Sequence, residues 1–144
     1  MKKQNGITLV ALVITIIVLL ILAGVSISLA LGNNGVLTRS SQAVVQNEKG
    51  TVEQEIKLGI ADCVTNYWTA WAQNASVKKS SYYLTATVQN SCTIGTVTVT
   101  NNLSNVDTGS VTVQYVVTAS GQKYTCTVNV ADGSISNFQG PIAN

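Results

Sequence analysis

Residues 1–31 read MKKQNGITLVALVITIIVLLILAGVSISLAL, a short polar and basic start followed by an uncharged run. That run covers residues 7–31, and an α-helix of 25 residues spans about 37 Å, more than the ~30 Å hydrocarbon core of a bilayer. Lys2 and Lys3 precede it, and basic residues stay on the cytoplasmic side of a membrane. The sequence therefore predicts a membrane-spanning helix, with everything after Leu31 outside the cytoplasm.

The part of the chain beyond this helix, residues 32–144, is long enough for one small globular domain. The formal net charge of the whole chain is +2, and Lys2 and Lys3 supply all of it because the other basic and acidic residues cancel. Nucleic-acid affinity comes largely from cationic contacts to phosphates. A near-neutral exported domain therefore gives no charge signal for such a partner.

Hydropathy alone leaves three interpretations of the N-terminus open. A cleaved secretory signal has a shorter apolar region, although Ser28-Leu29-Ala30 resembles its small-residue cleavage site. A plain membrane anchor needs nothing beyond the apolar helix. The third interpretation depends on a detail that a plain anchor does not need: Gly6 separates the basic start of the chain from Ile7, the first residue of the apolar run. One known family of proteins shows this detail at such a junction.

This junction resembles that of the type IV pilin family, including its pseudopilin and competence relatives. The matching residues are the leader KKQNG at 2–6 and the opening of the apolar helix, Ile7, Thr8, Leu9, Val10, Ala11, Leu12, Val13 and Ile14. The wider run looks most like that of pilin-like proteins from Gram-positive bacteria. The resemblance implies that a prepilin peptidase cuts between Gly6 and Ile7, and that the new N-terminus at Ile7 is methylated.

The resemblance also implies a function. We expect a structural subunit of an extracellular type IV pilus-like filament, serving adhesion, motility or surface contact. Its expected partners are the prepilin peptidase, the pilus assembly machinery, the membrane before assembly, and further copies of the chain in a helical filament. The precursor is expected in the cytoplasmic membrane with its N-terminus inside and its head outside, and the mature chain in a cell-surface filament.

Ala11 departs from the family pattern. Many pilins carry a glutamate at this position, which neutralises the N-terminal amine of a neighbouring subunit. Without it, the amine of Ile7 needs another partner, such as a backbone carbonyl, Thr8 or a lipid headgroup. The departure leaves open a minor pseudopilin of a type II secretion-like or DNA-uptake machine, with DNA as a partner only in that case. A monomeric membrane-anchored surface domain is the remaining alternative.

The residues after the apolar run predict a break and then an amphipathic helix. Gly32-Asn33-Asn34-Gly35 favours turns. Apolar residues then recur every three or four positions, which makes one stripe on a helix: Val52, Ile56, Ile60, Cys63, Val64 and Tyr67. The expected organisation is a leader at 1–6, a transmembrane or polymerisation helix at 7–31, a flexible break at 32–36, an amphipathic helix at 37–76 and an antiparallel sheet at 77–144.

The C-terminal half alternates apolar and polar residues, which predicts β-strands. The expected strands lie near residues 82–89, 93–101, 110–118, 122–131 and 135–138, with turns at Ser120-Gly121 and Asp132-Gly133. The predicted fold is α+β and pilin-like: a long apolar stem helix continues into an amphipathic helix that packs on a small antiparallel sheet.

Three cysteines, Cys63, Cys92 and Cys126, lie in the predicted exported part, where a disulfide can persist. A bridge from Cys126 to either Cys92 or Cys63 is possible, and so are three reduced thiols; the pairing stays open. A zinc site is disfavoured because the chain has no histidine.

No motif points to catalysis, a cofactor or a metal. The chain lacks histidine, and only Asp107 and Asp132 follow Asp62 among the acidic residues. Tyr67, Trp68 and Trp71 precede Lys78 and Lys79, which resembles a stacking surface for single-stranded DNA. We favour the interpretation that Tyr67 continues the apolar stripe and the tryptophans cover the edge of a small core.

Overall fold

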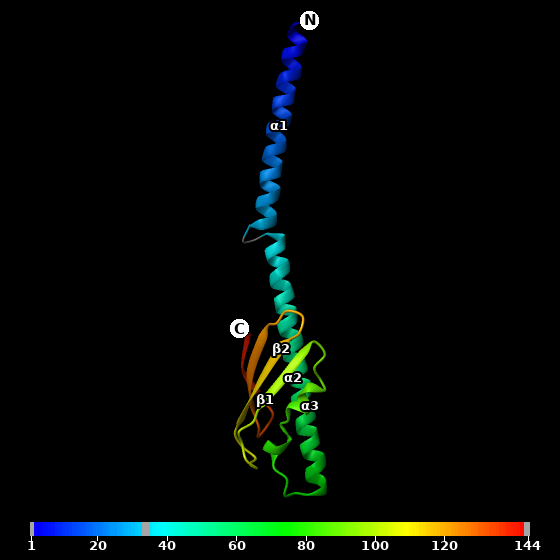
Figure 1. Cartoon of the computed structure of the whole chain (residues 1–144), viewed down its shortest axis with the longest axis vertical. Helices are drawn as coiled ribbons and strands as arrows, with labels where there is room; N and C mark the ends of the chain where they lie inside the picture. Colours follow the sequence, from blue (N-terminus) through cyan, green and yellow to red (C-terminus); the bar gives the residue numbers. More distant parts are fainter. Residues whose placement is uncertain (1, 33–34, 143–144) are drawn as a thin grey trace. The chain divides into compact units, whose positions relative to one another are not determined.

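The computed structural model describes residues 2–32 and 35–142, with side chains from Asn5 onward. The chain divides into two units, Met1–Val44 and Val45–Asn144. The elements follow in the order α1 Lys2–Leu31, α2 Val36–Gln73, a 3₁₀ turn η1 Lys79–Tyr82, α3 Thr85–Gln89, β1 Gly95–Thr100, β2 Ser110–Val117, β3 Lys123–Asn129 and β4 Ile135–Ile142 (Figure 1).

The first unit holds α1 and the first turns of α2. The expected break at 32–36 overlaps the interval between these helices, because α1 ends at Leu31 and α2 begins at Val36, the last residue of the expected break. Residues 33–34 of that break lie outside the described residues. On either side the backbone is bonded locally: Gly32 N–H donates to Ser28 O at 2.9 Å, and Gly35 N–H donates to Gly32 O at 2.8 Å.

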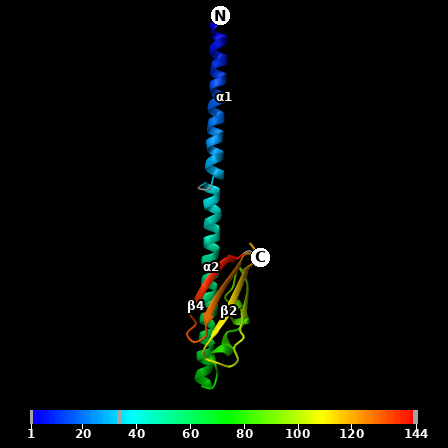
Figure 2. The ribbon, with the colours of Figure 1, turned by 90° about the vertical axis from the view of Figure 1, so that its left-hand side faces the viewer.

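The second unit is an antiparallel four-stranded sheet covered on one face by α2 (Figures 1 and 2). The strands follow one another in the order β1-β2-β3-β4, as short connections favour. Val113 pairs with Cys126, and Tyr115 pairs with Tyr124. Alternate residues within β2 and within β3 are buried, as the period-two pattern predicted. The pairing of the two strands places these buried residues on the same face of the sheet.

The core forms where the stripe of α2 meets this face. Val52, Ile56, Ile60 and Cys63 are buried at the helical spacing of three and four residues, against Val113 and its neighbours. Burial of each such side chain contributes roughly 1.5–3 kcal/mol. The predicted α+β fold, with an apolar N-terminal helix and an amphipathic helix packed on an antiparallel sheet, is confirmed.

The expected strand near 82–89 is wrong, because the chain forms η1 and α3 there. Val88 of α3 packs so closely on α2 that a Cβ atom added to Gly59 would lie 2.7 Å from Val88 Cγ1. Tyr83 is also buried, and its hydroxyl donates to Val130 O at 3.0 Å. Tertiary contacts of single residues thus decide this segment, and they override its strand-like alternation.

Candidate functional site

The candidate assembly site is the surface of α1, which is apolar on every side. Among the described residues, one helical stretch is long and apolar enough to cross a membrane, and its apolar window is not buried within the protein. Ile7 is 70 % exposed, and the large apolar residues that follow it to Leu31 are exposed as well. Such a surface is stable only in lipid or against other apolar helices.

Two hydroxyl groups within α1, those of Thr15 and Ser26, are bonded to the helix itself. Thr15 donates to the backbone oxygen of Ala11, and Ser26 Oγ donates to Leu22 O at 2.8 Å. Each hydroxyl thereby satisfies its donor one turn back, as Ser and Thr do in membrane helices. These two polar side chains therefore add no unsatisfied donor to the apolar surface.

The Gly6–Ile7 junction lies inside α1, which begins at Lys2. A Cβ atom added to Gly6 would meet no heavy atom within 4 Å. Glycine within a helix costs about 0.8–1.0 kcal/mol relative to alanine. No close contact in the described structure requires a glycine at this position.

Ala11 lies one turn beyond Ile7 on α1, and its backbone oxygen accepts the Thr15 hydroxyl. The first acidic residue of the chain is Glu48. The first unit, residues 1–44, therefore contains no carboxylate side chain.

In the second unit, a buried carboxylate that sequence reasoning missed joins three segments. Glu55 on α2 is only 6 % exposed. It accepts hydrogen bonds from the Thr93 backbone N–H at 3.1 Å, from the Thr93 hydroxyl and from the Tyr115 hydroxyl on β2. Burial is the largest influence and opposes ionisation, but together these bonds outweigh it and lower the pKa of Glu55.

A signal for this carboxylate was present in the sequence. Glu55 lies three residues after Val52 and directly before Ile56, so it falls inside the apolar stripe of α2. A charge within such a stripe needs a buried partner. Tyr115 is that partner, although it lies 60 residues away along the chain.

The three cysteines are free thiols in this structure, so neither candidate bridge is formed. Cys63 and Cys126 are buried in the core, and Cys92 is partly buried against it. Burial raises the pKa of Cys63, and it raises the pKa of Cys92 and of Cys126 to about 11. All three thiols are therefore protonated near neutral pH and are poor nucleophiles.

Aromatic side chains gather where α2 ends. Tyr67 is buried and continues the apolar stripe as predicted, whereas Trp68 and Trp71 are 51 % and 43 % exposed. The ring centroids of Tyr67 and Trp68 are 5.1 Å apart, and those of Trp68 and Trp71 are 5.7 Å apart. Lys79 Nζ lies 5.7 Å from the Tyr67 and Trp68 centroids. The tryptophans thus form an exposed surface beside the core.

A pocket of about 250 Å³ opens beside these rings, and we call it the aromatic pocket. Its walls include Val64, Tyr67, Trp68, Lys79, Tyr83 and Asp132. A second depression of about 500 Å³ also has Val64 and Asp132 in its walls. The two spaces therefore adjoin along α2 and the turn between β3 and β4.

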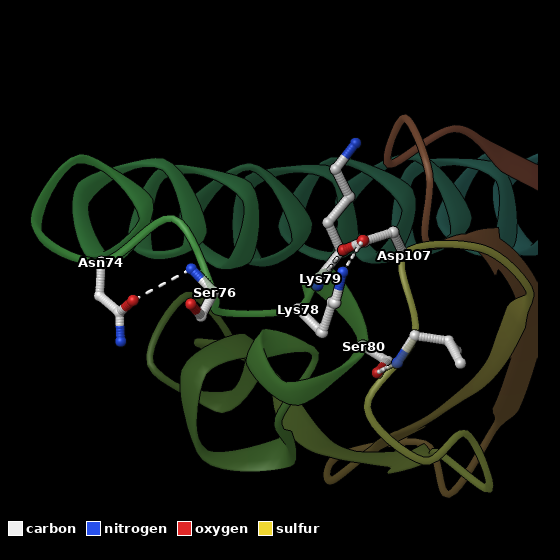
Figure 3. Close-up of polar contacts among 7 residues, drawn as sticks. Asn74, Ser76, Lys78, Lys79, Ser80 and Asp107 are labelled. Carbon is white, nitrogen blue, oxygen red and sulfur yellow. Dashed lines mark hydrogen bonds and ion pairs between the residues drawn. The ribbon is translucent and has the colours of Figure 1, made fainter.

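The segment that carries Lys79 is fixed to the loop before β2 (Figure 3). Lys78 Nζ forms an ion pair with Asp107 Oδ2 at 2.9 Å, and the Lys79 N–H donates to Asp107 Oδ1 at 3.0 Å. The Val106 N–H donates to Ser80 Oγ at 2.9 Å. Asn74 ends α2 with a turn in which its Oδ1 accepts the Ser76 N–H at 3.0 Å. These bonds hold one wall of the aromatic pocket in place.

Comparisons of the chain with protein-family models, with curated proteins and with solved structures find no match. Within the described ranges, no group of three or more His, Cys, Asp or Glu side chains could hold a metal ion.

Proposed function

We propose that the chain is a prepilin whose processed form polymerises through α1 into a type IV pilus-like filament. The observation that carries the proposal is the junction: a basic leader ends at Gly6, and the apolar helix begins at Ile7. A peptidase that recognises this step would remove the leader and keep the helix. The apolar surface would then move from lipid to the helices of other copies.

Gly6 is compatible with the proposal because, among the described residues, no close contact requires a glycine there. Its Cβ position is open, and alanine would form a better helix there. Recognition by an external protease would supply the missing reason. A plain membrane anchor gives no such reason.

The head is the part that this filament would present to its surroundings. Its core is formed within residues 45–144, and its strands carry many exposed Thr, Ser and Asn side chains. A polar surface of this kind is stable in contact with water, and the filament would use it for adhesion or surface contact.

A minor pseudopilin is the second candidate, and Ala11 favours it. A shaft subunit needs a partner for the buried amine of Ile7, and no acidic residue precedes Glu48. A subunit at the filament tip, or one present in few copies, is subject to this requirement less often. The abundance of the chain in sheared filaments separates the two roles.

The test is to shear surface material from cells that produce the chain and to image it by negative-stain electron microscopy with an antibody to the head. Labelling along the filament supports a shaft subunit, and labelling at the tip supports a minor subunit. In cells with Gly6→Val, we expect the unprocessed chain in the membrane and no labelled filament. Gly24→Val, at another open glycine of α1, is the matched control for a bulkier side chain in the helix.

A further inference from the structure

We propose that the aromatic pocket and the depression beside it form a binding site for a neutral oligosaccharide. The two spaces share Val64 and Asp132 and measure about 250 and 500 Å³. Because the pocket and the depression adjoin, they suit a ligand made of linked units. The site lies wholly in the second unit and does not depend on filament assembly.

Trp68 provides the stacking surface. Its ring is half exposed, yet Tyr67 and Trp71 hold it through edge-to-face contacts. The apolar C–H face of a pyranose ring packs well on such a ring and removes apolar area from water. Because the ring is already held, little side-chain entropy is lost on binding.

Asp132 provides a polar contact at the wall that the two spaces share. Its Oδ1 accepts the Ser134 N–H at 2.9 Å. Hydrogen bonds with Ser134 lower the pKa of Asp132, so the carboxylate is ionised at neutral pH. An ionised carboxylate accepts hydrogen bonds from sugar hydroxyls, and these are stronger than bonds between neutral groups.

The charges around the site disfavour a polyanion such as DNA. Lys79 Nζ donates to Ala131 O at 2.7 Å and lies over two aromatic rings. Lys57 pairs with Glu53 at 2.9 Å, and Lys78 pairs with Asp107 at the same distance. These three lysines are already engaged, and Asp132 would repel phosphates. A neutral ligand needs no free lysine and is not repelled by Asp132.

The experiment uses the full chain in phosphatidylcholine nanodiscs, because sugar-based detergents would compete. Isothermal titration calorimetry is carried out with tetrasaccharides of glucose, of galactose, of mannose and of N-acetylglucosamine. We expect at least one to bind and Trp68→Ala to weaken that binding at least about tenfold. Trp68→Phe should restore part of it, and Asp132→Asn should weaken it less. Leu58→Ala, which removes an exposed apolar side chain of α2 outside the pocket walls, should change it less than about threefold.

Three results would overturn the proposal: no tetrasaccharide binds, the ligand binds Trp68→Ala as well as the unchanged chain, or oligothymidylate competes for the same site at equal concentration. Circular dichroism of each variant confirms that the head is folded, which Trp68→Ala should permit because the ring is half exposed. Nanodiscs keep the chain unassembled. Failure here would therefore leave the filament proposal unchanged, and failure of the filament proposal would leave this one unchanged.

Discussion

Tyr115 on β2 donates its phenolic hydrogen to the carboxylate of Glu55 on α2, and both side chains are buried. Thr93, just before β1, donates to the same carboxylate. One charge therefore joins a helix, a strand and a loop inside the head. Burying a carboxylate is costly, so removal of any one donor should lower the free energy of unfolding of the whole head.

Tyr115→Phe should lower the free energy of unfolding of the head by about 1.5–3 kcal/mol, because a hydrogen bond to a buried charge is lost. Urea unfolding of the full chain in nanodiscs, followed by tryptophan fluorescence, measures it. Glu53→Gln is the matched control, since Glu53 pairs with Lys57 at the surface and such pairs contribute about 0.3–0.5 kcal/mol. Equal losses of unfolding free energy in the two variants would show that the buried bond stabilises the head no more than a surface ion pair.

Acid should destabilise the head through the same carboxylate. The pKa of Glu55 in the folded state lies below its ordinary value, so the ionised form stabilises the fold above the unfolded pKa of about 4.3. That stability is lost as the pH falls through the folded pKa. Urea unfolding between pH 7 and pH 3 should show the loss of stability. In Glu55→Gln, the free energy of unfolding should depend less steeply on pH. An unchanged slope in the variant would contradict this assignment.

Two glycines of α2 should respond to alanine in opposite directions. At Gly59 the new methyl group would lie 2.7 Å from Val88 Cγ1 and 2.9 Å from Val88 Cα, so Gly59→Ala should destabilise the head by about 1–3 kcal/mol. At Gly50 nothing lies within 4 Å, so Gly50→Ala should stabilise the helix by about 0.8–1.0 kcal/mol. Thermal unfolding of both variants tests the pair, and a shift of the same sign in both would contradict the close packing of α3 on α2.

The outer edge of β1 is covered by side chains of α3. Val97 N–H donates to Gln89 Oε1 at 2.8 Å, Gln89 Nε2 donates to Gly95 O at 3.1 Å, and Val99 N–H donates to Thr85 Oγ1 at 2.9 Å. These contacts occupy backbone groups that an edge strand would otherwise offer to another chain.

Gln89→Ala should therefore lower stability by about 1 kcal/mol and should increase β-type self-association of the head. Light scattering and infrared spectroscopy of the concentrated protein measure that association. Gln54→Ala, at an exposed glutamine of α2, should change neither quantity. Equal association of the two variants would show that α3 does not protect this edge.

Much of the fold was predictable because its signals are repeated along the chain. The apolar stripe of α2 and the alternation of β2 and β3 each rest on several residues, so single exceptions do not hide them. The segment at 82–89 was mispredicted because its conformation depends on single contacts. Val88 meets Gly59, and Tyr83 meets Val130, and both partners are distant in sequence.

The candidate sites also differ in whether they are formed by neighbouring residues or by residues distant in sequence. The junction at Gly6 and Ile7 is a local pattern, so the sequence alone indicates it. The bond between Glu55 and Tyr115 and the pocket beside Trp68 are formed by residues that only the fold brings together. Amphipathic periodicity places Glu55 on a helix face, but it does not indicate which strand supplies the donor.

Mass spectrometry of the mature N-terminus is the most direct measurement of the proposed function. The chain is purified from the membranes and the surface material of the cells that produce it, and its N-terminal peptide is sequenced. Processing as a prepilin predicts a chain that starts at Ile7, with a methyl group on its amine. A chain that starts at Leu31, or one that keeps Met1 in every fraction, would contradict it.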